Sequence, residues 1–182
     1  MTPLRLALVL ILAGGALAQS GLCECDHARP ETLAARNCSL CREAERHPPD
    51  TEIFYLKDNN PRKPNRWLVL ARAHGRGPQS LAETPKALRT RLWTAAIQKA
   101  KELWGDAWGV AYNGDTVRTQ CHLHLHIGKL LPAAVTRRKF VIVNGPAQIP
   151  APKDGEGIWV HPHRGKLMVH LGEQICETVL MR

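Results

Sequence analysis

Three histidines alternate with apolar residues in the stretch 121–127, which reads Cys-His-Leu-His-Leu-His-Ile. Successive side chains of a β-strand point to opposite faces, so His122, His124 and His126 are expected to share one face and the apolar residues the other. Imidazole is well suited to proton transfer, metal ligation or nucleophilic attack near neutral pH. A buried histidine needs its own hydrogen-bond partner, so three together are difficult to explain as plain core residues. We therefore expect this strand to carry chemistry.

The six cysteines admit two kinds of chemistry. Cys38 and Cys41 form a Cys-x-x-Cys pair, which is a common half of a zinc site. In an oxidising compartment the same pair could instead form a disulfide. The spacing leaves both interpretations open, and it assigns no pairing to the remaining cysteines, which are Cys23, Cys25, Cys121 and Cys176.

The first eighteen residues have the form of a secretory signal peptide. Arg5 gives a positive start, residues 6–12 are an apolar run, and residues 16–18 read Ala-Leu-Ala, a small-x-small cleavage site. The apolar run is too short to span a bilayer as a helix. We therefore expect cleavage after Ala18 and an exported, periplasmic protein, with an uncleaved N-terminal anchor as the alternative.

The chain is basic, with 25 Lys and Arg against 16 Asp and Glu. Such an excess attracts phosphates, nucleotides and anionic lipid surfaces. Aromatic residues make up only 5% of the chain and are not interleaved with basic ones, which argues against dedicated binding of single-stranded nucleic acid. The basic run 137–139 is expected to be a solvated charge run or a contact with an anionic membrane.

The clearest predicted helix covers residues 85–104. Thr84 is expected to cap it, Pro85 suits its first position, and Gly105 ends it. An apolar stripe recurs along this helix at helical spacing and is expected to enter the core; its members are Leu88, Leu92, Ala95, Ala96, Ala100 and Leu103.

Elsewhere, short apolar runs alternate with turn residues, which is typical of strands. Strands are expected at 53–57, 67–71, 108–112 and 140–143, a hairpin around 164–165, and short elements after Asn37 and near 175–180. The length of 182 residues fits one domain. We therefore predict a single α+β domain over 37–182, with a mainly antiparallel sheet and one long helix. A cysteine-containing segment, 19–36, precedes it.

The order of these motifs resembles the histidine-triad superfamily. The alternating histidine strand looks like its signature, and Cys38-x-x-Cys41 resembles the zinc half-site of many members. Residues 60–74 resemble the stretch that reads N-P-x-x-P-x-H-x-L-V-x-P-K-x-H in them. Arg66 or Trp67 stands where many members carry a ribose-contacting histidine, which argues against purine-nucleotide specificity. The resemblance implies a histidine-triad-like (HIT-like) fold.

The residues just before the histidines narrow the resemblance. Residues 118–120 read Arg-Thr-Gln, which is similar to the CDP-diacylglycerol pyrophosphatase branch. That branch is membrane-associated or exported, in agreement with the predicted leader. The resemblance implies hydrolysis of CDP-diacylglycerol to CMP and phosphatidate. The alternatives are a soluble nucleotide-conjugate hydrolase or nucleotidyl transferase, and an exported metal-binding protein without catalysis.

The resemblance also assigns roles to single residues. His124 would attack phosphorus and form a phosphoramidate that water later cleaves, and His126 would hold phosphate oxygens. The groups expected to bind the phosphate or to stabilise its developing charge are Thr119, Gln120, Arg118, Asn113 and the Gly114 amide. Many triad proteins form homodimers, so a homodimer is an expected partner state, besides peripheral contact with an anionic membrane.

His122 has a different expected role. The resemblance assigns it with Cys38, Cys41 and His74 to a structural zinc site, whose two sulfur and two nitrogen ligands suit tetrahedral Zn²⁺. The hydrolysis itself requires no cofactor. Three further histidines, namely His161, His163 and His170, are expected to be solvated loop residues, with a second metal site as the alternative.

Overall fold

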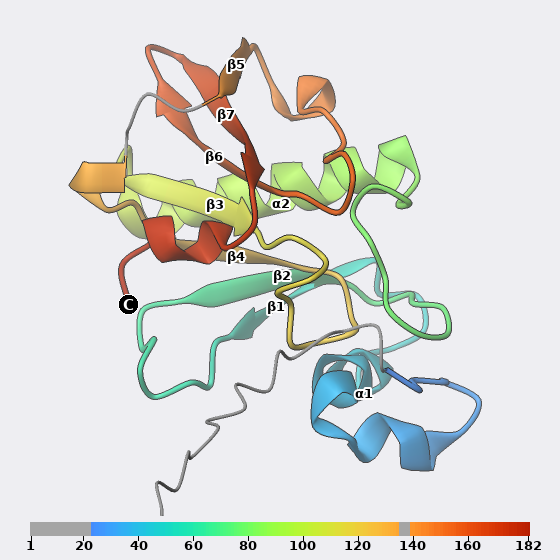
Figure 1. Ribbon diagram of the computed structural model, residues 1–182. Helices are drawn as coiled ribbons and strands as arrows, with labels where there is room; N and C mark the ends of the chain where they lie inside the picture. Colours follow the sequence, from blue (N-terminus) through green and yellow to red (C-terminus); the bar gives the residue numbers. More distant parts are fainter. Residues whose placement is uncertain (1–22, 135–138) are drawn as a thin grey trace, which may run out of the picture.

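The computed structural model describes residues 23–134 and 139–182 of the chain (Figure 1). The predicted signal peptide, 1–18, and most of the basic run 137–139 lie outside the described residues. Within the described range, no helix combines the length and apolar character that crossing a membrane requires.

One antiparallel sheet organises the molecule, with the strand order β1-β2-β4-β3-β6-β7-β5 (Figure 1). Its strands are β1 (Ile53–Lys57), β2 (Trp67–Ala71), β3 (Trp108–Tyr112), β4 (His124–Lys129), β5 (Phe140–Val143), β6 (Gly157–His163) and β7 (Lys166–Glu173). The expected hairpin joins β6 to β7 through Arg164 and Gly165, which have positive φ angles of 49° and 76°. Two such residues in succession are what the favoured two-residue hairpin turn requires. The predicted α+β class is thus confirmed.

Two α-helices flank the sheet. The long helix α2 (Lys86–Trp104) packs on one face, and the short helix α1 (Ser39–Glu45) lies beside β1 and β2, towards the other face (Figure 1). The remaining helical turns are of the 3₁₀ type: η2 (Pro30–Ala34), η3 (Arg36–Cys38), η4 (Pro132–Ala134), η5 (Pro146–Gln148) and η6 (Cys176–Val179). The helix expected after Asn37 and the last element near 175–180 are both present.

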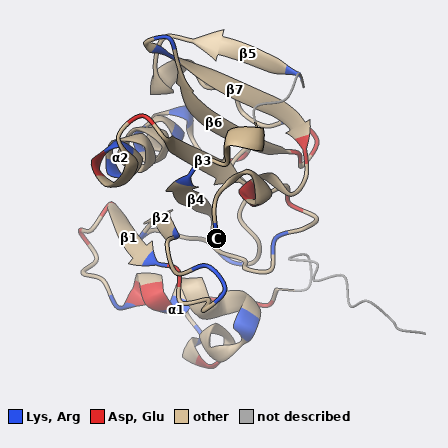
Figure 2. Ribbon diagram, turned by 90° about the vertical axis from the view of Figure 1, so that its left-hand side faces the viewer, with Lys and Arg blue, Asp and Glu red and all other residues tan. Residues whose placement is uncertain are grey.

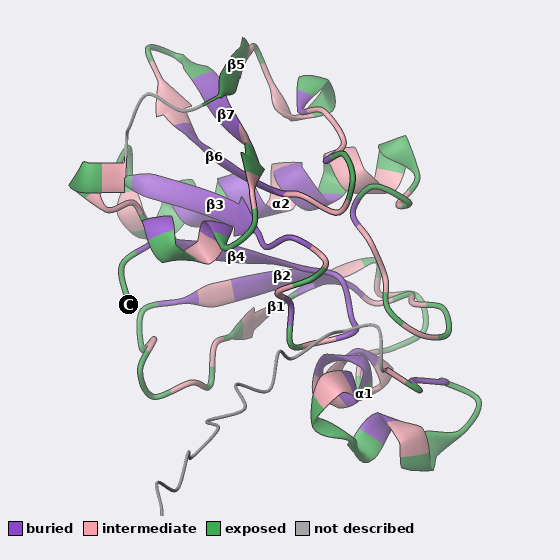
Figure 3. Cartoon of the chain, viewed as in Figure 1, coloured by how far each residue is buried: buried purple, intermediate pink, exposed green. Residues whose placement is uncertain are grey.

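The main core lies between α2 and the sheet, where β2, β3 and β4 are buried (Figure 3). Leu92, Ala96 and Ala100 enter it as predicted, but Leu103 is exposed, and Trp93 and Ile97 are buried although the predicted stripe omitted them. The buried face of α2 is therefore rotated relative to that stripe.

The predicted cap of α2 is wrong. The Thr84 hydroxyl donates to the carbonyl of Ser80 rather than accepting from the first turn of the helix. The helix begins at Lys86, after Pro85, whose side chain makes no capping bond. Because Thr84 folds back onto the preceding turn, its hydroxyl is not available as a cap.

The histidine strand is shorter than the sequence suggests. Strand β4 begins at His124, which pairs with Leu70 near the end of β2. Further back, the Cys121 amide donates to the carbonyl of Asn37, and the Cys121 carbonyl accepts from the amide of Gln79. The backbone before His124 is thus held by segments outside the sheet, and His122 lies ahead of the strand rather than in it.

The C-terminal tail packs on the face of the sheet opposite α2. Its backbone bonds to the end of β4 and the residues after it: the Leu131 amide donates to the Val179 carbonyl, and the Met181 amide donates to the Lys129 carbonyl, both at 2.8 Å. The Arg66 guanidinium is 2% exposed and donates to the carbonyls of Glu177, Leu180 and Met181. Each of these bonds fixes the tail against the sheet.

We expect Gly157→Ala to lower the free energy of unfolding by about 1–3 kcal/mol, the usual cost of overpacking. A Cβ atom there would lie 2.6 Å from the Cys176 sulfur, 2.7 Å from the Tyr112 carbonyl oxygen and 2.9 Å from that of Glu173. Gly145→Ala is the matched control, because no atom lies within 4 Å of its Cβ position. Urea unfolding curves compare the two variants. Equal midpoints would contradict this account of the tail packing.

Candidate active site

His124 and His126 face a cavity of about 540 Å³ on the side of the sheet opposite α2. Its walls come from α1, from the β1–β2 connection, from residues 117–120 and from η6. This volume lies within the range of roughly 300–1,000 Å³ that is usual for small-molecule sites. The two histidines come from the centre of the sheet, which gives them a rigid base.

The position of the proton on His124 follows from its hydrogen bond. Its Nδ1 lies 2.8 Å from the carbonyl oxygen of His122. A carbonyl only accepts, so Nδ1 donates and Nε2 carries the lone pair. Burial, with a smaller contribution from His126, lowers the pKa of His124 to about 3. The ring is therefore neutral at neutral pH and is suited to nucleophilic attack through Nε2.

His126 stands next to His124, with 4.9 Å between the ring centroids. Its Nε2 lies 3.5 Å from the amide nitrogen of Asn113, and its Nδ1 lies 3.7 Å from a carboxylate oxygen of Glu177. Burial lowers the pKa of His126 to about 4, although the Glu177 carboxylate acts in the opposite direction. His126 is thus also neutral at neutral pH.

Arg118 is a buried cation at this cavity, with 2% exposure. One guanidinium nitrogen, Nη2, donates to the Gln79 carbonyl and to Asp115. Its Nε and Nη1 atoms are buried with no hydrogen-bond partner among the described residues. Unpaired buried donors are costly, and a guanidinium matches the geometry of a phosphate. Arg118 thus brings a buried guanidinium to the cavity wall, and its predicted role in binding phosphate stays a prediction.

Of the other predicted phosphate-binding residues, three line the cavity and one does not. Asn113, Thr119 and Gln120 line the cavity with the histidines. The side-chain oxygen of Gln120 accepts a hydrogen bond from the Ser39 hydroxyl at 2.6 Å, so part of this side chain holds the start of α1. Gly114 does not line the cavity, and its amide donates to the carbonyl of Gln174 at 2.8 Å. The Gly114 amide is therefore not placed to stabilise a phosphate.

Sequence analysis missed Glu177, which brings an acid from the C-terminal tail into the cavity. Its carboxylate lies 2.5 Å from Lys63 Nζ and 2.9 Å from Arg66 Nη1. Burial alone would raise the pKa of Glu177, but interaction with His126, Lys63 and Arg66 outweighs it and brings the pKa to about 2. No motif marks this residue, since it lies far along the chain from the triad.

The four predicted zinc ligands do not form one group. Cys41 and His74 come together with Cys25, and their ligand atoms lie within 4.8 Å of one another. Cys38 instead lies with Cys23 and Cys121. The predicted Cys38–Cys41 pairing is thus not formed, either as a zinc half-site or as a disulfide.

Cys38 and Cys41 are separated because each has a partner in the segment that precedes the predicted domain. Cys23 and Cys121 form a disulfide, and the Cys38 sulfur lies 3.3 Å from that of Cys23. Two residues later, Cys25 joins Cys41 and His74. The two N-terminal cysteines therefore direct Cys38 and Cys41 to different clusters.

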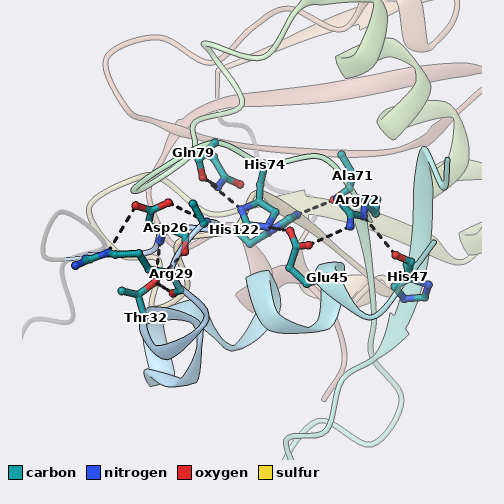
Figure 4. A network of polar contacts seen from close by, with 12 residues as sticks. Asp26, Arg29, Thr32, Glu45, His47, Ala71, Arg72, His74, Gln79 and His122 are labelled. Atoms are coloured by element: carbon teal, nitrogen blue, oxygen red, sulfur yellow. Dashed lines mark hydrogen bonds and ion pairs between the residues drawn. The ribbon is translucent and has the colours of Figure 1, made fainter. Parts of the chain in front are cut away.

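His122 lies beside the group formed by Cys25, Cys41 and His74. Its Nε2 is 2.7 Å from the carbonyl oxygen of Ala71 and must donate to it, which leaves the lone pair on Nδ1. That Nδ1 is buried and has no hydrogen-bond partner among the described residues. The His74 ring lies 5.0 Å away, and its Nε2 contacts the Glu45 carboxylate at 2.8 Å (Figure 4). His122 and His74 are thus held near each other by partners outside the cysteine cluster.

The remaining histidines lie on β6 and β7 and do not line the cavity. The expectation of solvated loop residues is wrong for His161 and His170, which are buried on β6 and β7 and stack with Trp159. Their Nε2 atoms are 3.2 Å apart. Within the part of the chain that the structure describes, neither they nor His163 belong to a group of three or more metal-ligating side chains.

Comparison with known proteins adds no assignment: no family model matches the chain, and no curated protein matches it. The function is therefore argued from the site itself.

We expect the free energy of unfolding to fall as the pH is lowered from 6.5 towards 4. Over this window the unfolded chain binds one more proton than the folded chain at each of His124 and His126, whose folded pKa values are about 3 and about 4. Each residue contributes about 1.4 kcal/mol per pH unit. Urea unfolding at several pH values measures the slope.

The variant that tests this is His124→Asn, which should reduce the slope by one proton. Identical slopes in the wild type and the variant would contradict the assignment of a buried neutral His124.

Proposed function

We propose that this protein hydrolyses the pyrophosphate bond of a nucleotide-containing substrate through a phosphoramidate on His124. The observation that carries the proposal is the tautomer of His124. The His122 carbonyl keeps the proton on Nδ1, so the lone pair of Nε2 is available at a cavity that the buried cation Arg118 also lines. A neutral nucleophile beside a buried cation is the combination that attack on an anionic phosphorus needs.

The reaction has two steps. The lone pair of His124 Nε2 attacks the phosphorus next to the nucleoside, a nitrogen–phosphorus bond forms, and the phosphorus–oxygen bond to the second phosphate breaks, so that this phosphate leaves with the electron pair. The proton on Nδ1 stays hydrogen-bonded to the His122 carbonyl while the ring carries positive charge. Water then attacks the phosphoramidate and releases the nucleoside monophosphate.

The substrate that we propose is CDP-diacylglycerol, hydrolysed to CMP and phosphatidate. The resemblance of residues 118–120 supports it, as does an apolar part of the cavity wall formed by Leu40, Leu56 and Leu68. Basic and acidic residues lie side by side on α1 at the cavity, as Figure 2 shows. Export to the periplasm after cleavage at Ala18, and peripheral contact with an anionic membrane, belong to the same proposal.

We expect the mature protein to release CMP from CDP-diacylglycerol in detergent micelles, and His124→Ala to reduce this rate by at least about 1,000-fold, as loss of a nucleophile does. His163→Ala is the control, because it removes a histidine that does not line the cavity. A water-soluble CDP ester is tested in parallel. Hydrolysis of the soluble ester alone would point to the soluble-conjugate alternative. CMP release that His124→Ala leaves unchanged would overturn the mechanism.

We also propose that Cys25, Cys41, His74 and His122 bind a structural Zn²⁺. Two thiols and two imidazoles suit tetrahedral zinc. The buried lone pair of His122 Nδ1 supports its role as a ligand, because its other nitrogen donates to a carbonyl, as zinc-bound histidines do. Cys25 takes the place that the sequence pattern gave to Cys38. Bound there, zinc would supply a cross-link from the N-terminal segment to the end of β2 and the start of β4.

The purified protein is expected to contain one zinc per chain by elemental mass spectrometry. Cys25→Ser and Cys41→Ser should each lose it, whereas Cys38→Ser should retain it, because Cys38 lies in the other cluster. Retention of zinc in Cys25→Ser with loss in Cys38→Ser would restore the ligand set that the spacing suggested.

A further inference from the structure

Glu177 reaches His126 by two routes. Its carboxylate lies 3.7 Å from His126 Nδ1. Its backbone amide donates to the side-chain oxygen of Asn113 at 2.9 Å, and the nitrogen of the same Asn113 amide lies 3.5 Å from His126 Nε2. One residue of the tail therefore acts on both nitrogens of this imidazole, directly on one side and through Asn113 on the other.

These contacts decide where the proton of His126 resides. Because the Asn113 oxygen already accepts from the Glu177 amide, the Asn113 group that faces His126 is the NH₂ donor. A donor at Nε2 requires a lone pair there, so the proton of the neutral ring lies on Nδ1, facing the Glu177 carboxylate. This tautomer makes Nε2 a proton acceptor, and a carboxylate stands ready to stabilise the imidazolium that would result.

We propose that Glu177 is a positioning residue that makes His126 the general base for the second step of the proposed hydrolysis. The inference rests on the proposed function. In that step a water oxygen attacks phosphorus and its proton passes to the lone pair of His126 Nε2, which gives up its long 3.5 Å contact with the Asn113 NH₂ group. The bond from phosphorus to His124 Nε2 breaks, and the electron pair returns to His124. Glu177 stabilises the positive charge on His126 through Nδ1–H, a contact that shortens once the charge develops, as such contacts do on going from free enzyme to reacting complex.

The surroundings of His126 fit this role. The charged groups around it are Glu177, Lys63, Arg66 and Arg118, and His124 is its titratable neighbour. The cations oppose protonation of His126, and the Glu177 carboxylate, 3.7 Å from Nδ1, favours it.

Glu177→Gln isolates the charge. The glutamine keeps the backbone amide that orients Asn113, and its side-chain oxygen can still accept from Lys63 and Arg66. Arg66 also retains its bonds to three tail carbonyls, so the tail is expected to stay in place. Glu83→Gln is the control, because Glu83 is exposed and forms no ion pair among the described residues.

Pre-steady-state kinetics with CDP-diacylglycerol, together with intact-protein mass spectrometry, provide the test. In Glu177→Gln we expect the first phosphatidate to be released at the wild-type rate, the later CMP release to slow by about 100-fold, and the covalent nucleotidyl protein to accumulate. Glu83→Gln should behave as wild type.

Two other outcomes would contradict the role of Glu177 and the proposed function, respectively. If both steps slow equally, or neither changes, Glu177 does not act through the base of the second step. If neither wild type nor variant ever forms a covalent nucleotidyl protein although both are folded, the proposed function itself fails.

Discussion

The alternation of side chains along β4 is the constraint on which the site depends. Leu125 and Ile127 must enter the core beneath α2, so His124 and His126 are placed on the opposite face. Pairing with β2 on one side and β3 on the other fixes the register. A slip by one residue would place both histidines in the core and two large apolar side chains in the cavity, so the burial energy of the core also maintains the positions of His124 and His126.

The second face of the sheet is covered as well, and this coverage gives the histidines their chemistry. The C-terminal tail and α1 exclude water from His124 and His126, and burial is the first cause of their lowered pKa values. Arg66 helps to attach the tail, because it donates to three tail carbonyls. Although Arg66 does not line the cavity, it thus contributes to the burial in which the two neutral imidazoles persist.

How much of this arrangement the sequence predicted depends on how far apart along the chain the residues in contact lie. Period-two alternation placed His124 and His126 together, and the run before them placed Arg118, Thr119 and Gln120 at the same cavity, because these residues are close in sequence. Glu177 escaped prediction because its position depends on how the tail folds back across the sheet. Short-range patterns carry no information about such a contact.

The cysteines show that a local motif does not identify partners that come from another segment of the chain. Cys-x-x-Cys is a local motif, yet Cys38 and Cys41 have different partners, because Cys23 and Cys25 approach from a separate segment. Spacing gives the ligand types but not which sulfur each will meet. The stripe on α2 was right in part, since Ala96 and Ala100 enter the core, but it omitted the buried Trp93 and Ile97.

The two cysteine clusters lie next to the backbone just before His124. The disulfide of Cys23 holds Cys121, and the group of Cys25, Cys41 and His74 lies beside His122. The carbonyl of His122 is the acceptor that fixes the tautomer of His124. Because this carbonyl precedes β4, the strand ladder does not hold it, whereas the disulfide of Cys23 anchors the neighbouring Cys121. The N-terminal segment therefore helps to hold the acceptor that sets the tautomer of His124.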